Sequence, residues 1–276
     1  MPYELTGLEG KVAVVSGAGR MRSIGRPIAV ELARAGCDIV LTGTGRAPEN
    51  YPDDEKAAGW RDIESVAEEV RALGRRALPV VVDISDTTAV NSLAATVATE
   101  FGGAHVLVNN AAASRGADRV PIVELDIDLW KHVLNVNLNG TFAMSKVFAQ
   151  QFITQGSGGA IINISSIAGR MAAANSGAYS ASKAAIHALT STMAKEVGPH
   201  NIRVNSILPG MIDTSRLDDM RAAGRWDAAI EANIPLRRAG TGTDIAALAV
   251  FLCSDQGSWI TGQQINVDGG HLSLSW

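Results

Sequence analysis

Short apolar runs bounded by turn residues alternate with longer segments of helical periodicity along the chain. Such runs predict strands buried on both faces, and they occupy residues 11–16, 38–42, 77–82, 106–109, 160–164, 202–207 and 264–267. Apolar residues three and four apart predict helices between them, at about 26–35, 63–73, 86–101, in two stretches after 117, from 178 onward and at 245–253. The alternation has no repeat or compositional break. It therefore predicts one domain, residues 1–276, with a doubly wound (Rossmann-type) α/β fold on a seven-stranded parallel sheet.

Two segments interrupt the alternation. Residues 43–60 contain two prolines and a charge cluster, and they predict a long loop inserted after the second strand. Residues 209–238 are also irregular, and the part from about 211 to 238 mixes Leu217, Met220 and Trp226 with charged residues. We expect this second segment to form a lid over a substrate.

Composition excludes several classes of partner. The chain is 46% hydrophobic and carries a net charge of -4, which favours neither nucleic acid nor an anionic membrane as partner. Cys37 and Cys253 are isolated, without metal-ligand spacing, so we expect no metal and a reducing compartment. Because no apolar segment resembles a signal peptide or a membrane span, we expect a cytoplasmic protein.

The first candidate for chemistry is a tyrosine and a lysine at the start of the helix predicted from residue 178. Tyr179 and Lys183 lie four residues apart, so their side chains share one helix face. A neighbouring ammonium stabilises a phenolate and lowers the tyrosine pKa from its ordinary value of about 10. Ser166, after strand 160–164, is placed to hydrogen-bond a carbonyl oxygen. The three side chains suit carbonyl and alcohol interconversion, although a Tyr-x-x-x-Lys pair alone also occurs by chance on surface helices.

The second candidate is a glycine-rich turn, residues 17–25, between the first strand and the first helix. A helix N-terminus that follows such a turn binds phosphate, because its free N–H groups and its dipole attract anions. A simple tight turn is the alternative.

Seven motifs in register resemble the short-chain dehydrogenase/reductase family from residue 8 to residue 270, and in particular its 3-oxoacyl-ACP reductase-like members. They are Ser16-Gly17-Ala18…Ser23-Ile24-Gly25, Asp83, Asn109-Asn110-Ala111-Ala112, Asn137 in Val-Asn-Leu-Asn-Gly, Ser166 thirteen residues before Tyr179 with Lys183, Pro209-Gly210-Met211-Ile212-Asp213-Thr214, and Ile260-Thr261-Gly262…Asp268-Gly269-Gly270. The glycine motif is two residues longer than the family's, its middle glycine is Ser23, and Ala112 replaces a glycine.

The resemblance implies a role for each matching residue. Tyr179 would exchange a proton with the substrate oxygen, Lys183 would lower its pKa and hold a ribose, and Ser166 would polarise the carbonyl. Asn137 would anchor a water that links Lys183 to solvent. The cofactor would contact Tyr179 and Lys183. It would also contact Gly17, Ser23, Ile24, Asp83, Ile84, Asn109, Ala111, Pro209, Gly210, Ile212 and Thr214.

Alternatives remain open for these roles. Asn137 and Asn109 also suit a purely structural role in the sheet core. Asp83 also suits a helix N-cap for the segment that begins at Ser85. We expect Ser165 to be a structural neighbour of Ser166. For the whole chain, the alternatives are an enoyl reductase, whose Tyr and Lys are spaced farther apart, and a non-catalytic dinucleotide-binding protein on the same fold.

The end of the second strand bears on the cofactor. A site for NAD usually has a carboxylate there, which binds both ribose hydroxyls and repels a 2′-phosphate. This chain instead has Thr44 and Arg46, and the longer glycine turn carries Arg20 and Arg22 toward the same edge. We therefore expect NADP(H) over NAD(H). The alternative is that a carboxylate of the insertion, Glu49, Asp53, Asp54 or Glu55, folds back onto the ribose.

The resemblance also implies a homotetramer or homodimer with a small-molecule carbonyl or alcohol substrate. The predicted interface lies on the helices around Asn137 and Ala185, with the C-terminal segment as a second contact. Its apolar side chains would be Ala184, Ala185, Ala188, Phe142, Phe148 and Phe152, and Trp276 would be covered by the second contact.

Overall fold

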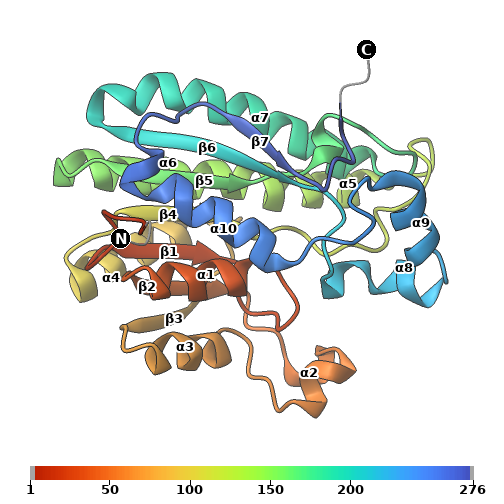
Figure 1. Ribbon diagram of the computed structural model, residues 1–276, viewed down its shortest axis with the longest axis horizontal. Coiled ribbons are helices and arrows are strands. Elements are labelled where there is room, and N and C mark those ends of the chain that lie inside the picture. The colour runs from red at the N-terminus through yellow and green to blue at the C-terminus, as the bar shows by residue number, and fades with distance from the viewer. Residues whose placement is uncertain (1–3, 274–276) are drawn as a thin grey trace.

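The seven predicted strands form one parallel sheet. The computed structural model describes residues 4–273, and the strands lie in the order β3-β2-β1-β4-β5-β6-β7 (Figure 1). Their bounds are β1 Val12–Ser16, β2 Asp38–Gly43, β3 Ala77–Val81, β4 Val106–Asn109, β5 Gly159–Ile164, β6 Ile202–Pro209 and β7 Gln264–Val267. The strand order reverses between β1 and β4, where doubly wound sheets bind ligands at the carboxyl edge.

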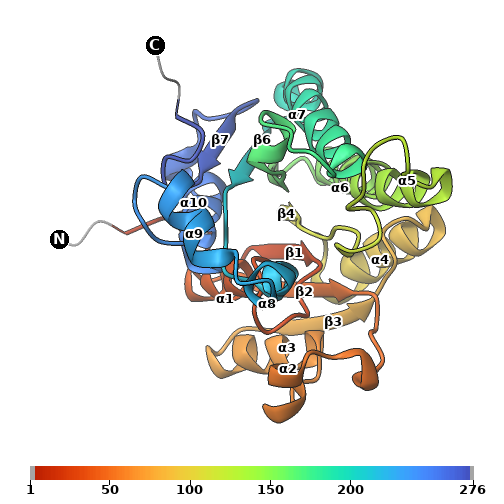
Figure 2. The same cartoon turned by 90° about the vertical axis from the view of Figure 1, so that its right-hand side faces the viewer.

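Helices cover both faces of the sheet (Figure 2). One layer contains α1 (Gly25–Arg34), α3 (Ile63–Ala72) and α10 (Gly242–Cys253), and the other contains α4 (Thr87–Phe101), α6 (Thr141–Gln155) and α7 (Gly177–Val197). Along β2, Ile39 and Leu41 pack into the first layer, whereas Val40 packs into the second. Since successive strand residues point to opposite faces and both faces are covered, the strands are continuously apolar.

A run of helix follows β4. The two stretches predicted after residue 117 are α5 (Ile127–Leu134) and α6, joined by a π-helical segment, Asn135–Gly140. Within residues 4–273, no helix is long and apolar enough to cross a membrane.

The two irregular segments contain short helices. The insertion holds a 3-10 turn, Pro48–Asn50, and α2 (Asp53–Ala57). The segment predicted as a lid holds a 3-10 turn, Ser215–Leu217, then α8 (Asp218–Ala222) and α9 (Trp226–Asn233). Trp226, Ile230 and Ile234 form a separate small hydrophobic cluster there. Figure 1 shows α2, α8 and α9 on the side toward which the strand arrows point.

The N-cap of α4 decides whether Asp83 caps that helix. Asp86, not Asp83, is the N-cap, and its carboxylate accepts hydrogen bonds from the N–H groups of Thr88 and Ala89. Asp83 is exposed and accepts from the backbone and hydroxyl of Ser85 instead. The reading of Asp83 as the helix cap is therefore wrong.

The outward faces of α6 and α7 are partly apolar. Ala184 and Ala188 are exposed on α7, and Phe142 is 49% exposed on α6. Phe148 and Phe152, in contrast, are fully buried against the sheet, so the expectation that they add to an external surface is wrong. Trp276 lies outside the described residues.

Candidate active site

Tyr179, Lys183 and Ser166 meet where β5 ends and α7 begins. Ser166 lies two residues after the end of β5, and its hydroxyl accepts a hydrogen bond from Ala168 N at 3.1 Å, which fixes the turn. Ser166 lies close enough to Tyr179 to help lower its pKa. Lys183 is 3% exposed, and its Nζ donates to the carbonyl of Ile164 at 2.8 Å. The strand terminus therefore orients both the hydroxyl and the ammonium toward the tyrosine.

The surroundings of Tyr179 favour its phenolate. Burial by itself raises the pKa of Tyr179, but the charges of Lys183 and Arg216, the hydroxyl of Ser166 and the charge of Arg119 outweigh it, so the pKa is lowered. Burial also lowers the pKa of Lys183, which the charge of Tyr179 opposes. Lowered values in a buried pair are typical of a proton-transfer site.

Asn137 lies in the π-helical segment and is fully buried. Its Oδ1 accepts from Ala113 N at 2.8 Å, and its Nδ2 donates to Ser182 Oγ at 3.0 Å. The side chain thus ties the loop after β4 to α7, one residue from Lys183. A π-bulge of this kind is frequent at functional sites because it re-aims side chains.

Ser165 and His187 hold α7 against β5. The hydroxyl of Ser165 lies 3.0 Å from the carbonyl of Lys183 and 2.9 Å from His187 Nε2. Burial, with the charges of Arg170 and Lys183, lowers the pKa of His187 to about 4. This contact confirms the structural role expected for Ser165.

The glycine turn is suited to a pyrophosphate. Gly17 has a φ of 66°, and a Cβ there would lie 2.6 Å from Ala111 Cα, so only glycine fits. The first turn of α1 has no acidic residue, and among residues 4–273 the one side chain that contacts its N–H groups is Ser23, whose Oγ accepts from Arg26 N at 3.2 Å. Ser23 Oγ donates to Arg20 O at 2.8 Å, which stabilises the lengthened turn. The N–H groups and the helix dipole are therefore directed at the space where a phosphate would bind.

The insertion folds back onto this turn. Glu55 Oε1 accepts from Met21 N at 2.9 Å, and Trp60 Nε1 donates to Gly19 O at 2.6 Å. The carboxylate of Asp62 lies so close to Gly19 that a Cβ on that glycine would overlap it. Asp62 has a φ of 53°, a conformation that costs energy for a residue with a side chain. The segment expected to be a loop therefore contains short helices and packs on the glycine turn.

Arg46 is held inside this segment. Its Nη1 lies 2.9 Å from Glu55 Oε2 and its Nε lies 3.4 Å from Asp62 Oδ2, while its guanidinium stacks on Tyr51. Burial lowers the pKa of Arg46, but the two carboxylates outweigh it and the pKa is raised. A guanidinium and two carboxylates therefore lie together at the end of β2, and two polar atoms there, Arg46 Nη2 and Thr42 Oγ1, are buried without a hydrogen-bond partner among the described residues.

Arg22 does not turn toward the ribose edge as expected. It pairs with Asp54 of the insertion at 2.7 Å and with Asp218 of α8 at 2.6 Å. Hydrogen bonds, first with Asp218, raise its pKa. Arg22 therefore links the glycine turn, the insertion and the segment predicted as a lid.

The remaining predicted residues lie along the carboxyl edge. Asn109 Nδ2 donates to Ser145 and to Asn163, while its Oδ1 is buried without a partner. This bonding confirms the bracing of the sheet. Thr44 is exposed beyond β2, and Pro209 is the last residue of β6. The others lie after β1, β3, β4 and β6: Arg20, Ile84, Ala111, Gly210, Ile212 and Thr214.

Sequence reasoning missed Arg119 in the loop after β4. The guanidinium carbons of Arg119 and Arg216 lie 4.6 Å and 5.1 Å from the ring centre of Tyr179. Neither arginine belongs to a motif, and no spacing indicates that the two loops meet.

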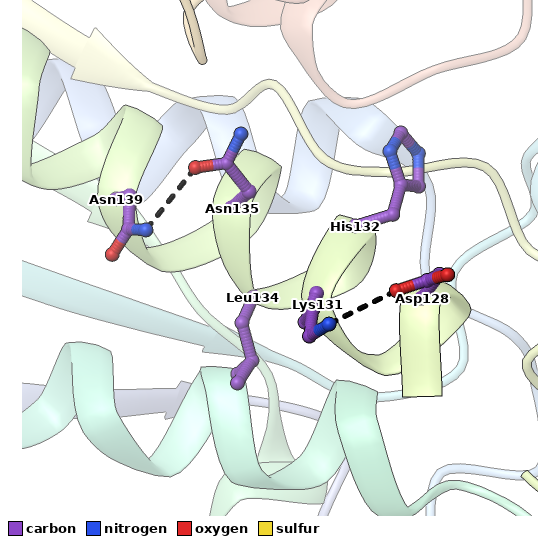
Figure 3. Close-up of a pocket in the computed structure, with 6 residues that line it drawn as sticks. All are labelled: Asp128, Lys131, His132, Leu134, Asn135 and Asn139. Atoms are coloured by element: carbon purple, nitrogen blue, oxygen red, sulfur yellow. Dashed lines mark hydrogen bonds and ion pairs between the residues drawn. The ribbon is translucent and has the colours of Figure 1, made fainter. Parts of the chain in front are cut away.

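A surface hollow lies elsewhere, along α5 and the π-helical segment (Figure 3). Asp128, Lys131, His132, Leu134, Asn135 and Asn139 line it. None of the predicted site residues is among them.

Comparisons with known proteins agree with this geometry. A family model described as enoyl-(acyl carrier protein) reductase matches residues 17–271. The chain is 37% identical over 266 residues to the 2-dehydro-3-deoxy-D-gluconate 5-dehydrogenase of Escherichia coli, covering 96% of this chain and 97% of that protein. It is 35% identical over 263 residues to a 3-oxoacyl-[acyl-carrier-protein] reductase of Pseudomonas aeruginosa, covering 95% and 98%.

Solved structures are similar over the same length. Carveol dehydrogenase from Mycobacterium avium in complex with NAD has a TM-score of 0.84 and 28% identity, covering 97% of this chain and 99% of that one. An Agrobacterium tumefaciens protein described as a candidate 2-deoxy-D-gluconate 3-dehydrogenase, with bound NADP, has a TM-score of 0.82 and 32% identity, covering 96% and 98%.

The family model and the named relatives, together with the doubly wound sheet, show an oxidoreductase that acts on CH–OH donors with a nicotinamide dinucleotide. The chain belongs to the short-chain dehydrogenase/reductase family.

Proposed function

We propose that this enzyme interconverts a ketone, or a 3-oxoacyl thioester, and a secondary alcohol, with Tyr179 as the acid and base. The observation that carries the proposal is the lowered pKa of Tyr179 beside the buried ammonium of Lys183 and the hydroxyl of Ser166. The names of the two curated relatives above, a sugar-acid dehydrogenase and a 3-oxoacyl reductase, support the reaction class.

Each residue has a distinct task in this mechanism. Bound NAD(P)(H) would supply or accept the hydride. Ser166 would donate a hydrogen bond to the substrate oxygen and hold it beside Tyr179. Tyr179 would give its phenolic proton to that oxygen in reduction and take it back in oxidation. Lys183 would stabilise the phenolate between these steps, and Asn137 would anchor a water that returns the proton from solvent.

The cofactor is proposed to be NADP(H). Arg46, with a buried unpartnered Nη2, and Thr44 stand at the end of β2, and Arg20 lies in the adjoining turn. A 2′-phosphate would compete with the carboxylates of Glu55 and Asp62 for the guanidinium of Arg46, because its contact with the guanidinium is also charge-assisted. The carboxylate of Asp62 favours NAD(H) as the second candidate, because it lies between the glycine turn and the end of β2. The ratio of kcat/KM for the two cofactors decides between them.

The two alternative hypotheses, an enoyl reductase and a non-catalytic dinucleotide-binding protein, have less support. The tyrosine and lysine are four residues apart on α7, closer than the enoyl reductase branch places them. A dinucleotide-binding protein without catalysis has no need of a tyrosine with a lowered pKa. We also propose a cytoplasmic location, which the free and buried thiols of Cys37 and Cys253 support. The segment from 211 to 238 is proposed to be the substrate lid.

Turnover of a ketone panel with both reduced cofactors tests the reaction. The wild-type enzyme is expected to reduce at least one ketone, and Tyr179→Phe to lower kcat by about 10²–10⁴-fold with little change in cofactor affinity. Lys183→Ala is expected to lower kcat and to weaken cofactor binding as well. Near-normal kcat in Tyr179→Phe would refute the assignment, and binding without any turnover would favour the non-catalytic reading.

A further inference from the structure

Two arginines from separate loops converge on the catalytic tyrosine. Arg119 comes from the loop after β4, and Arg216 comes from the 3-10 turn that precedes α8. Their guanidinium carbons lie 4.6 Å and 5.1 Å from the ring centre of Tyr179. Both arginines add to the effect of Lys183 in lowering the pKa of Tyr179, and their guanidinium groups also carry donors that the proton transfer itself does not use.

The protein leaves positive charge uncompensated around the ring. Among residues 4–273, Arg216 has no carboxylate partner, and its Nη1 donates to the carbonyl of Ala113 at 2.7 Å. Arg119 has Asp118, whose carboxylate lies 3.3 Å from Nε and also accepts from Gly116 N. Nearby Arg115 forms an ion pair with Asp219 at 2.9 Å. Three arginines and Lys183 therefore face two carboxylates.

Solvent does not offset this excess well. The side chain of Arg119 is 17% exposed, and its Nε is buried. Burial lowers the pKa of Arg119, Asp118 opposes this, and the charges of Arg216 and Arg115 lower it further. Like charges that are brought together away from water repel one another, and an anion placed between them relieves that repulsion.

We propose that the substrate carries a carboxylate in addition to its reacting carbonyl and that Arg119 and Arg216 bind this carboxylate. The inference rests on the proposed function and narrows its substrate to an oxo acid or hydroxy acid, in preference to a neutral ketone or a thioester. A guanidinium presents a planar set of donors that matches a carboxylate. The ring of Tyr179 fixes where these donors lie, so the carboxylate and the carbonyl are held at a set separation.

A phosphate of the cofactor is the other anion within reach. Arg216 is close enough to Arg20 of the glycine turn to lower its pKa, after burial and the charge of Arg46. Arg119 has no such neighbour in that turn and lies closer to the tyrosine than Arg216 does. The two sources of anion are separated by measuring the substrate and the cofactor independently in each variant.

Matched pairs of ketones provide the test. Pyruvate, acetoacetate and levulinate are compared with their methyl esters, and 5-keto-D-gluconate is compared with L-sorbose, because each pair differs in the carboxylate. The wild-type enzyme is expected to have at least tenfold higher kcat/KM for the acid of the best pair. Arg119→Gln and Arg216→Gln are each expected to lower the acid kcat/KM at least tenfold more than the neutral value, which also falls because each arginine helps to lower the pKa of Tyr179.

Three measurements keep the outcome decisive. Arg225→Gln removes an exposed arginine of the same segment as Arg216. It is expected to leave kcat/KM unchanged for both the acid and the neutral ketone. Cofactor dissociation constants are expected to stay within threefold in Arg119→Gln, and a tenfold loss there would assign the site to the cofactor phosphate and overturn the proposal. In Tyr179→Phe with bound reduced cofactor, cofactor fluorescence measures acid binding without turnover.

Two results would overturn the inference while leaving the proposed function intact. One is a wild-type preference for the neutral member of every pair. The other is an equal loss for acid and neutral substrates in both arginine variants. Absence of turnover for all ketones would instead contradict the proposed function, and the fluorescence titration would still decide whether the arginines bind the acid.

Discussion

Replacing Arg46 with alanine is expected to destabilise the protein, although Arg46 lies in a segment whose sequence predicts a loop. The side chain of Arg46 is 15% exposed, and its partner Glu55 is 1% exposed. Removing the guanidinium leaves Glu55 and Asp62 buried without their ion-pair partner, although the charge of Arg20 still acts on both. It also removes the stacking on Tyr51.

The magnitude follows from burial. Breaking a buried ion pair from one side costs about 3–5 kcal/mol, because the remaining charge stays out of water without compensation. In a chain of this size, 1 kcal/mol corresponds to about 2–4 °C in melting temperature. Arg46→Ala is therefore expected to melt about 6–20 °C below the wild-type protein. Adding Glu55→Gln to Arg46→Ala is expected to recover about 2 kcal/mol, since one of the two carboxylates that lost their partner is then neutral.

Thermal and urea unfolding of the wild type, both single variants and the double variant form a double-mutant cycle. Arg61→Ala is the control, because Arg61 and its partner Glu68 are both more than half exposed, and its melting temperature is expected to equal that of the wild type. Additive effects of Arg46→Ala and Glu55→Gln would refute the reasoning, as would a melting temperature of Arg46→Ala within about 2 °C of the wild type.

The same variant tests the cofactor. If Arg46 holds a 2′-phosphate, Arg46→Ala lowers kcat/KM for NADP(H) relative to NAD(H) by about 1.5–3 kcal/mol, which is about 10–150-fold. A wild-type preference for NAD(H) would show that the carboxylates of the insertion, not Arg46, face the ribose.

His187 should make stability depend on pH, because its pKa is about 4 in the fold against 6.5 for an ordinary histidine. The folded state favours the neutral ring, so this contribution is complete above about pH 6.5 and is lost as the pH falls toward 4, about 3 kcal/mol in all. His187→Gln should flatten this part of the profile in thermal unfolding at pH 4.5–7.5, and an unchanged slope would contradict the assignment. The exposed Phe142 with Ala184 and Ala188 should make the protein a homodimer or homotetramer, and light scattering that shows only a monomer at micromolar concentration would exclude this.

The fold and the reacting residues were within reach of the sequence. Parallel strands that are buried on both faces read as continuous apolar runs, and this signal is local, so all seven strands were located. Tyr179 and Lys183 are also a local pattern, since four residues span one turn of a helix. Asn137, Ser166 and the glycine turn followed from motifs that resemble a known family.

Contacts between distant segments were decided only by the tertiary structure. The prolines and charges of residues 43–60 predicted a loop, yet Glu55 and Trp60 bind the glycine turn more than thirty residues away. Arg22 was expected at the ribose edge, but carboxylates from two other segments hold it. Such pairings depend on where the chain brings opposite charges together, and no spacing encodes that.

The same reason explains the arginines at the tyrosine. Arg119 and Arg216 are ninety-seven residues apart, in irregular segments without a period, and each alone reads as an ordinary surface charge. They become neighbours because the loop after β4 and the segment after β6 both leave the carboxyl edge of one sheet. Local periodicity therefore determined the scaffold and the pairing of Tyr179 with Lys183, whereas the meeting of loops at that edge determined the charge around Tyr179.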